Sequence, residues 1–176
     1  GVRFSDVVDG DPHYFDWPAD NEIFSHRGPI EFTTTMGDNV MVLGGPSCIG
    51  RLTGTSPMTF DTDWVVSDNG PVSNSAWALT GGQLFYVSPT GLHAFDGASV
   101  QNVTGSLLER FRDSAMDPAS AAIGVVPGGE LVVCWAEDSQ AAETYVLDIR
   151  RGTWRQASAV AFDFMSLENA GEHRLY

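Results

Sequence analysis

The sequence predicts an all-β fold: a fragment of a β-propeller with about three and a half antiparallel four-stranded blades and one short inserted helix. The first observation behind this is a repeat. A glycine-led turn followed by an apolar strand begins at Gly37, Gly81, Gly128 and Gly171, which lie 44, 47 and 43 residues apart. The second is that each repeat holds short apolar runs separated by Gly, Asp and Ser turns. A period of about 40–50 residues with only strand and turn signals is typical of a propeller blade.

Each repeat is expected to contain four short strands joined by tight turns, where glycine supplies the positive φ that hairpins require. The first strands are expected at residues 30–36, 75–80, 121–127 and 162–168. The second strands are expected at residues 40–43, 84–88, 131–136 and 175–176. The third are expected at residues 48–53, 92–95 and 144–149, and the fourth at 64–67, 99–103 and 154–158.

These strands divide the chain into consecutive units. Residues 1–29 are expected to be the end of a preceding blade plus a long loop, followed by blades at 30–74, 75–120, 121–161 and a truncated one at 162–176. Because a closed propeller needs about six to eight blades, the chain is expected to be part of a larger polypeptide.

A helical insert is expected between the second and third blades, at about residues 104–116. Ser106 and Glu109 have the spacing of a capping box, and Leu107, Leu108 and Phe111 share one helical face. Glu109, Arg110 and Arg112 point elsewhere, which makes them candidate interface residues. The apolar stripe either covers the edge of its own propeller or leaves the polar face to contact a neighbouring subunit or tail protein.

The charge balance disfavours electrostatic binding to nucleic acid. Nine basic residues, all arginine, stand against 23 acidic ones, for a net charge of -14. Such a surface repels phosphate backbones. The absence of lysine fits either a GC-rich genome or a saline habitat.

Cysteine usage and hydropathy place further bounds on the chain. Cys48 and Cys134 lie far apart in apolar surroundings, which favours two buried thiols over a disulfide and fits a reducing compartment. No apolar run approaches the roughly 18 residues of a transmembrane helix.

Several segments match, in order, a pattern of one phage family. They are Arg3-Phe4-Ser5, Asp11-Pro12-His13, Trp17-Pro18-Ala19-Asp20-Asn21, the turn at 51–57, Gly70-Pro71-Val72-Ser73, the hairpin at 84–97 and Glu109-Arg110-Phe111-Arg112. In this set the chain resembles the propeller-bearing nozzle proteins of short-tailed phages, also called packaged-DNA stabilisation or head-to-tail proteins. The resemblance covers roughly residues 3–160, although members of that family are much longer.

The resemblance implies a structural virion protein of the phage tail or head-to-tail connector. Such a protein would assemble in the host cytoplasm as a ring, usually a hexamer, below the portal and adaptor. The ring would contact other tail proteins and continue the DNA channel, retaining the packaged genome until ejection. DNA would be passive channel content, and no membrane contact, catalytic residue, cofactor or metal is implied.

The other candidate sites favour structural roles. Asp9-Gly10-Asp11-Pro12 offers only one carboxylate pair of the kind that calcium loops alternate, so this acidic segment is interpreted as a turn-forming loop. No two of the four histidines lie within four residues of one another, and His93 is expected to be a packed core or edge residue. Asp148 is expected to cap a turn, as in kelch blades.

Two alternative functions remain open. The tryptophans could line a carbohydrate- or receptor-binding platform, but Trp77, Trp135 and Trp154 fall within strands, where burial between blades is simpler. A kelch-like interaction scaffold is the other alternative.

Overall fold

The computed structural model describes residues 2–3, 7–8, 11–12, 22–23, 28–37, 40–55, 59–67, 69–113, 120–126, 128–135, 143–157, 166–169 and 172–175. Side chains are described for the part of these ranges between residues 28 and 157, apart from residues 67, 112 and 113.

The core of the molecule is three four-stranded antiparallel sheets, each a simple meander. The first sheet contains β5 (Phe32–Thr35), β6 (Val40–Gly45), β7 (Cys48–Thr53) and β8 (Asp61–Ser67). The second contains β9 (Trp77–Thr80), β10 (Gln83–Ser88), β11 (Gly91–Phe95) and β12 (Val100–Asn102). The third contains β13 (Ala122–Val126), β14 (Glu130–Trp135), β15 (Glu143–Asp148) and β16 (Thr153–Ala157).

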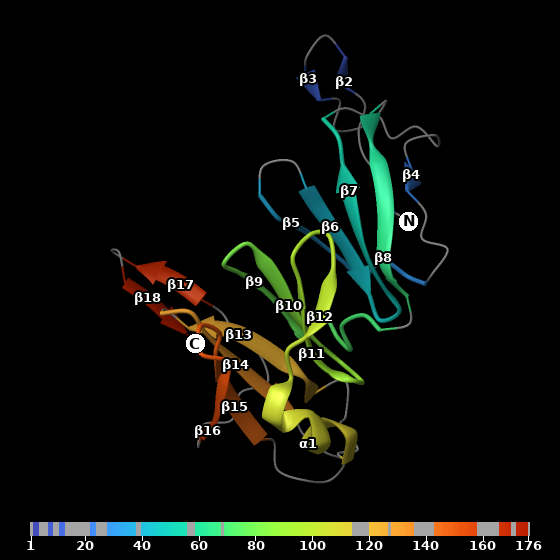
Figure 1. The fold of residues 1–176 in the computed structure, drawn as a ribbon. Helices are drawn as coiled ribbons and strands as arrows, with labels where there is room; N and C mark the ends of the chain where they lie inside the picture. Colours follow the sequence, from blue (N-terminus) through green and yellow to red (C-terminus); the bar gives the residue numbers. More distant parts are fainter. Residues whose placement is uncertain are drawn as a thin grey trace.

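Three short hairpin-like pairs accompany these sheets. Near the N-terminus, β1 (Val2–Arg3) pairs with β4 (Glu22–Ile23), and β2 (Val7–Val8) pairs with β3 (Asp11–Pro12). At the other end, β17 (Ser166–Asn169) pairs with β18 (Glu172–Leu175). This last hairpin lies beside β13, so it continues the series of sheets (Figure 1).

The prediction of an all-β chain with antiparallel four-stranded, blade-like sheets is confirmed. Every described strand pair is antiparallel, and each glycine-led turn between the first and second strands has positive φ: 69° at Gly37, 58° at Gly81 and 109° at Gly128. An L side chain rarely adopts such angles, which is why glycine recurs at this point of the repeat.

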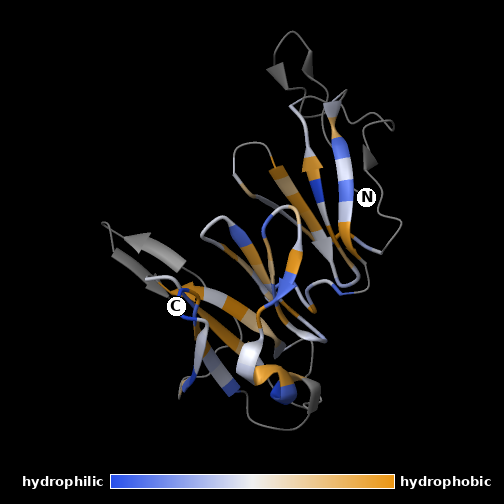
Figure 2. Ribbon diagram, viewed as in Figure 1, coloured by the Kyte–Doolittle hydropathy of each residue, from blue (hydrophilic) through white to orange (hydrophobic). Residues whose placement is uncertain are grey.

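The second sheet is buried on both faces because it lies between the other two (Figure 1). Leu84 and Tyr86 of β10 point toward the first sheet, where Val42 and Ile49 pack against them. The alternate residues of the same strand belong to a second cluster, shared with β13, β14 and β15 of the third sheet. Burial on both faces explains the consecutive apolar and aromatic residues at 84–87 of β10; Figure 2 shows orange stretches mixed with white and blue in this sheet.

Hydrogen bonds to main-chain carbonyls reinforce this stacking where the second and third sheets meet. The Ile123 N–H donates to the Ser75 carbonyl at 2.9 Å, and the Ser73 hydroxyl donates to the Ala121 carbonyl at 3.0 Å. Both bonds join the segment before β9 to the start of β13. The first strands of neighbouring sheets are therefore close together.

The helical insert lies between the second and third sheets in the chain, as predicted, but it begins differently. A 3-10 turn at Gly105–Leu107 leads into α1 (Leu108–Asp113), and Thr104 rather than Ser106 precedes the turn. The predicted Ser106–Glu109 capping box is therefore wrong. The Thr104 hydroxyl instead accepts a 2.8 Å hydrogen bond from the Leu92 N–H, so the insert is tied to β11.

Both cysteines are buried and neither is in a disulfide, Cys48 in β7 and Cys134 in β14. Among the described helices, none is long and apolar enough to cross a membrane.

The contact between the first two sheets yields a stability prediction. Leu84→Ala should lower the free energy of unfolding by about 2–5 kcal/mol, because the side chain is fully buried and leaves a cavity. Leu79 is its direct cross-strand partner on β9 and is 36% exposed. The matched Leu79→Ala variant should lose less than about 1 kcal/mol. Urea unfolding followed by tryptophan fluorescence measures both, and equal losses would contradict the stacked arrangement.

Candidate functional site

The apolar stripe of the helical insert packs against the third sheet of its own chain. Phe111 is 2% exposed, and its ring centroid lies 4.5 Å from that of Trp135 on β14. Trp135 in turn stacks on Tyr145 of β15 at 4.9 Å. Leu107 packs against the same cluster. Of the two roles considered for the stripe, covering its own sheets is the one that these contacts support.

The predicted interface residue Arg110 pairs with a carboxylate of its own chain. Its Nε and Nη2 donate to Glu143 Oε2 and Oε1 at 3.1 and 2.7 Å, which is a two-pronged pair between α1 and the start of β15. Tyr145, two residues further on the same face of β15, donates its hydroxyl to Glu143 Oε2 at 2.7 Å. The Tyr145 hydroxyl and then Arg110 hold the pKa of the Glu143 carboxyl below its usual range.

The other two predicted interface residues differ in how far the structure describes them. Glu109 is exposed in the first turn of α1. Arg112 lies in α1, but its side chain is outside the described part of the structure. Of the two whose side chains the structure describes, Arg110 is the one with a side-chain contact given above, and a role for all three in binding a partner stays a prediction.

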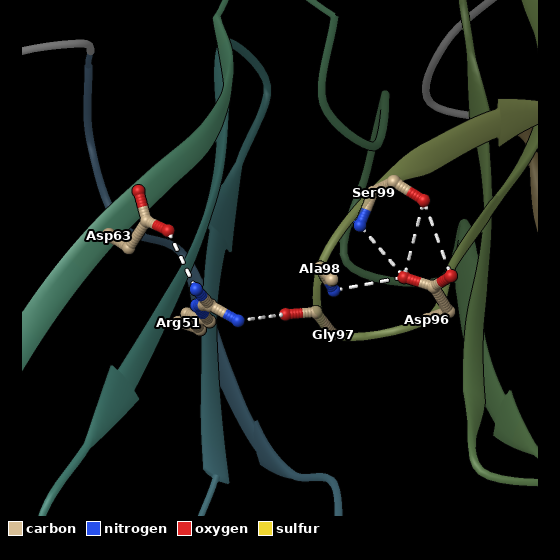
Figure 3. A network of polar contacts seen from close by, with 6 residues as sticks. All are labelled: Arg51, Asp63, Asp96, Gly97, Ala98 and Ser99. Carbon is tan, nitrogen blue, oxygen red and sulfur yellow. Dashed lines mark hydrogen bonds and ion pairs between the residues drawn. The ribbon is translucent and has the colours of Figure 1, made fainter.

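A second polar contact joins the first and second sheets, and sequence analysis did not anticipate it. Arg51 of β7 donates from Nη1 to the Gly97 carbonyl at 2.8 Å and from Nη2 to Asp63 Oδ2 at 3.0 Å (Figure 3). Asp63 lies directly opposite Arg51 on β8. The guanidinium therefore bridges a carboxylate of its own sheet and a turn of the next one.

The turn that Arg51 contacts is shaped by Asp96. Its Oδ1 accepts hydrogen bonds from the N–H groups of Ala98 and Ser99 at 2.9 and 2.7 Å, which hold the β11–β12 turn closed (Figure 3). These backbone donors, Ser99 first, lower the pKa of the Asp96 carboxyl. Gly97 has φ of 93°, which places its carbonyl in reach of Arg51.

Asp148 shapes the corresponding turn of the third sheet in the same way, as predicted. Its Oδ1 accepts hydrogen bonds from the N–H groups of Arg150 and Arg151 at 3.0 and 3.1 Å. An aspartate that closes the turn between third and fourth strands is thus a repeated device of the second and third sheets.

A hollow of about 430 Å³ lies beside the Arg51 junction, between the turn ends of the first two sheets. Met36, Gly37 and Val40 line it from the first sheet, and Gly82 and the turn at 96–98 line it from the second. Arg51 and Asp96 are its charged groups, and each is already engaged within the chain. Within the described ranges, no group of three or more His, Cys, Asp or Glu residues could hold a metal ion.

The aromatic and histidine residues considered from the sequence are packed inside the stack. Trp77 stacks on Phe32 across the first and second sheets, with ring centroids 4.6 Å apart. Trp154 packs against the cluster between the second and third sheets. His93 is 6% exposed and stacks on Tyr86, so the prediction of a packed histidine is confirmed.

The missed contacts share one cause, which is that they join residues distant in the chain. Arg51 and Gly97 lie 46 positions apart, and Arg110 and Glu143 lie 33 apart. The sequence did hold one indication of the Arg110–Glu143 contact. Glu143 and Tyr145 are two residues apart and therefore share one face of a strand, where a carboxylate beside a phenol can attract a cation.

No protein-family model matches the chain, and no curated protein sequence matches it.

The Arg110–Glu143–Tyr145 contact predicts a pH-dependent contribution to stability. Glu143→Gln should lower the free energy of unfolding by about 1 kcal/mol at neutral pH, because hydrogen bonds to a charged carboxylate are lost. The pKa of Glu143 is lower in the folded chain than in the unfolded one. Its contribution is therefore present above the unfolded pKa of about 4.3 and disappears as the pH falls through the folded value.

Urea unfolding of wild type and Glu143→Gln at pH values from neutral to about 3 measures this effect. The two curves should converge in acid. Glu109→Gln, on the exposed side of α1, is the control and should change stability little at any pH. A wild type–variant difference that stays constant across the range would contradict the assignment.

The Arg51 junction predicts a smaller, geometry-dependent effect. Arg51→Lys should lower the free energy of unfolding by about 0.5–1 kcal/mol, because a lysine ammonium cannot span the carbonyl and the carboxylate as the guanidinium fork does. Arg150→Lys, in an exposed turn of the third sheet, is the matched control and should have no measurable effect. Identical urea midpoints for Arg51→Lys and wild type would show that the bridge contributes nothing to docking.

Proposed function

We propose that this chain forms consecutive blades of a β-propeller in a structural virion protein, the nozzle ring of a phage tail or head-to-tail connector. The observation that carries the proposal is the serial stacking of three equivalent meanders, with the helical insert between the second and the third. This order of elements agrees with the nozzle-protein resemblance of the sequence. A closed propeller repeats such sheets around a central axis.

The ion pairs of the arginines and the excess of acidic residues support a scaffold that surrounds DNA without binding it. Each of Arg51, Arg110, Arg151 and Arg155 forms an ion pair with a carboxylate of its own chain. Their positive charge is therefore partly neutralised within the chain. With 23 acidic residues against nine basic ones, the chain as a whole would repel phosphates. A channel wall with this balance would let the genome pass during ejection.

The placement of Trp77 and Trp135 favours this scaffold over a carbohydrate- or receptor-binding module. Sugar platforms display aromatic rings to solvent, whereas Trp135 is 1% exposed and Trp77 is stacked between two sheets. A kelch-like interaction scaffold shares the same stacked architecture and is the second candidate. The distinction between the two rests on partners: a ring of identical subunits joined to tail proteins, or an adaptor for unrelated proteins.

Purification of the polypeptide that contains this chain, followed by mass photometry and negative-stain microscopy, tests the proposal. The expected result is a ring of subunits, and mass spectrometry of purified phage particles should detect the same polypeptide. A monomer that is absent from particles would exclude the nozzle role. Binding to a glycan array that Trp77→Ala abolishes without unfolding the protein would instead support the carbohydrate-binding alternative.

The helical insert provides a sharper test of subunit contact. The double variant Arg110→Glu with Glu143→Arg keeps the pair within the chain but reverses the charge that α1 presents. If α1 meets a neighbouring subunit or tail protein, ring formation at physiological salt should fall at least several-fold, since like charges then oppose each other.

A matched control is available on the third sheet, where Arg155 and Glu130 pair at 3.0 Å. The Arg155→Glu with Glu130→Arg variant should form rings as the wild type does. Ring formation unaffected by the Arg110–Glu143 exchange would rule out a contact that depends on this charge, and Glu109→Arg and Arg112→Glu would then test the two other predicted interface residues.

A further inference from the structure

The segment that connects the first sheet to the second passes between them at Asn69 and Gly70. The Gly70 N–H donates to the carbonyl of Pro46, in the β6–β7 turn, at 2.9 Å. Gly70 is buried, and a Cβ on it would overlap the carbonyl oxygen of Gly45. The close approach of these two backbones therefore requires glycine at position 70.

Asn69 is held on its other side by the second sheet. The Thr90 hydroxyl donates to Asn69 Oδ1 at 3.0 Å, and Asn69 Nδ2 lies 3.3 Å from Nε2 of His93. Because an amide nitrogen only donates, His93 Nε2 accepts this bond, and burial lowers the pKa of His93 so that the neutral ring is favoured. An amide side chain supplies both the acceptor and the donor that this site uses, whereas an ionised carboxylate supplies no donor.

The contacts at positions 69 and 70 thus favour an asparagine directly followed by a glycine. In this dipeptide the glycine backbone nitrogen is least shielded, because glycine has no side chain. We propose that Asn69 is a deamidation site gated by the docking of the first sheet on the second. The Gly70 nitrogen loses its proton to solvent base and attacks Asn69 Cγ, and the new C–N bond replaces the bond to Nδ2, which leaves as ammonia. One water then opens the succinimide to aspartate or isoaspartate, so that water is consumed and ammonia released.

The docked sheets withhold both reacting groups. The Gly70 nitrogen is committed to Pro46 of the first sheet, and the Asn69 amide is committed to Thr90 and His93 of the second. Attack requires the nitrogen to reach solvent base and turn toward Cγ, which breaks the bond to Pro46. The reaction therefore proceeds through states in which the two sheets separate locally.

The product changes the docked arrangement. Deamidation replaces the amide donor with a carboxylate beside His93 Nε2, and the isoaspartate product also lengthens the backbone where Gly70 fits closely against Gly45. Modification at Asn69 thus marks molecules in which the first and second sheets have opened at this contact. This inference does not depend on the proposed virion role.

Site-resolved mass spectrometry of the full chain, incubated in mildly alkaline buffer with and without concentrated urea, tests the proposal. Asn74-Ser75, in an exposed turn, is an internal control on the same molecule. In urea, Asn69 should deamidate faster than Asn74. In native buffer the order should reverse, with Asn69 slowed at least about tenfold relative to urea, since only opened molecules react. Native deamidation of Asn69 at its rate in urea would overturn the proposal.

A variant of Thr90 shows whether slow deamidation of Asn69 in the native protein comes from its contact with the second sheet or from burial alone. Thr90→Val removes the hydroxyl that holds Asn69 Oδ1, so the native rate at Asn69 should rise toward the rate in urea, while the rate in urea stays unchanged. Thr153→Val, in an exposed position on β16, is the matched control and should leave both rates as in wild type. A native rate unaffected by Thr90→Val would contradict a gate at this contact. If Thr90→Val does not fold, the comparison of wild type in buffer and in urea decides alone.

Discussion

Burial of both faces of the second sheet is the constraint on which the rest of the structure depends. A single meander of this length has two apolar faces and cannot hide either by itself. Leu84 and Tyr86 need the first sheet, and Phe85 and Val87 need the third. Each sheet therefore contributes to the core of its neighbour, and stability rises by stacking rather than by the closure of one compact core.

Polar contacts fix the position of each sheet relative to its neighbour, because apolar packing alone would allow one sheet to shift along the other. Arg51 fixes the first sheet against the β11–β12 turn, and the Ile123–Ser75 main-chain bond fixes the third against the second. Near the β10–β11 turn, at the opposite end of β11, the bond from Gly70 to Pro46 holds the connecting segment to the first sheet, and the bond from Thr90 to Asn69 holds it to the second. Several of these contacts use a backbone carbonyl as acceptor, so their geometry is set by turn conformation and tolerates little displacement.

The helical insert belongs to this system of contacts. Phe111 extends the cluster between the second and third sheets, and Arg110 reaches Glu143 at the start of β15. Thr104 ties the beginning of the insert to β11. The insert is thereby bonded to both the second and the third sheet. Its exposed side, which includes Glu109, is left as the surface available for a partner.

The sequence by itself determined the kind of structure. The recurrence of glycine at positions 37, 81 and 128 and the short apolar runs around it predicted every strand of the three sheets, usually to within about two residues, since hairpin turns and side-chain alternation are local properties. It also identified the insert and its apolar face. The tertiary structure alone decided which polar groups meet. Thr104 rather than Ser106 precedes the insert, and its hydroxyl bonds to the main chain of Leu92 in β11. Arg110, whose side chain stays about half exposed, pairs with Glu143, which lies 33 residues away on the third sheet. Local propensity carries no information on how segments that far apart in the chain lie relative to one another.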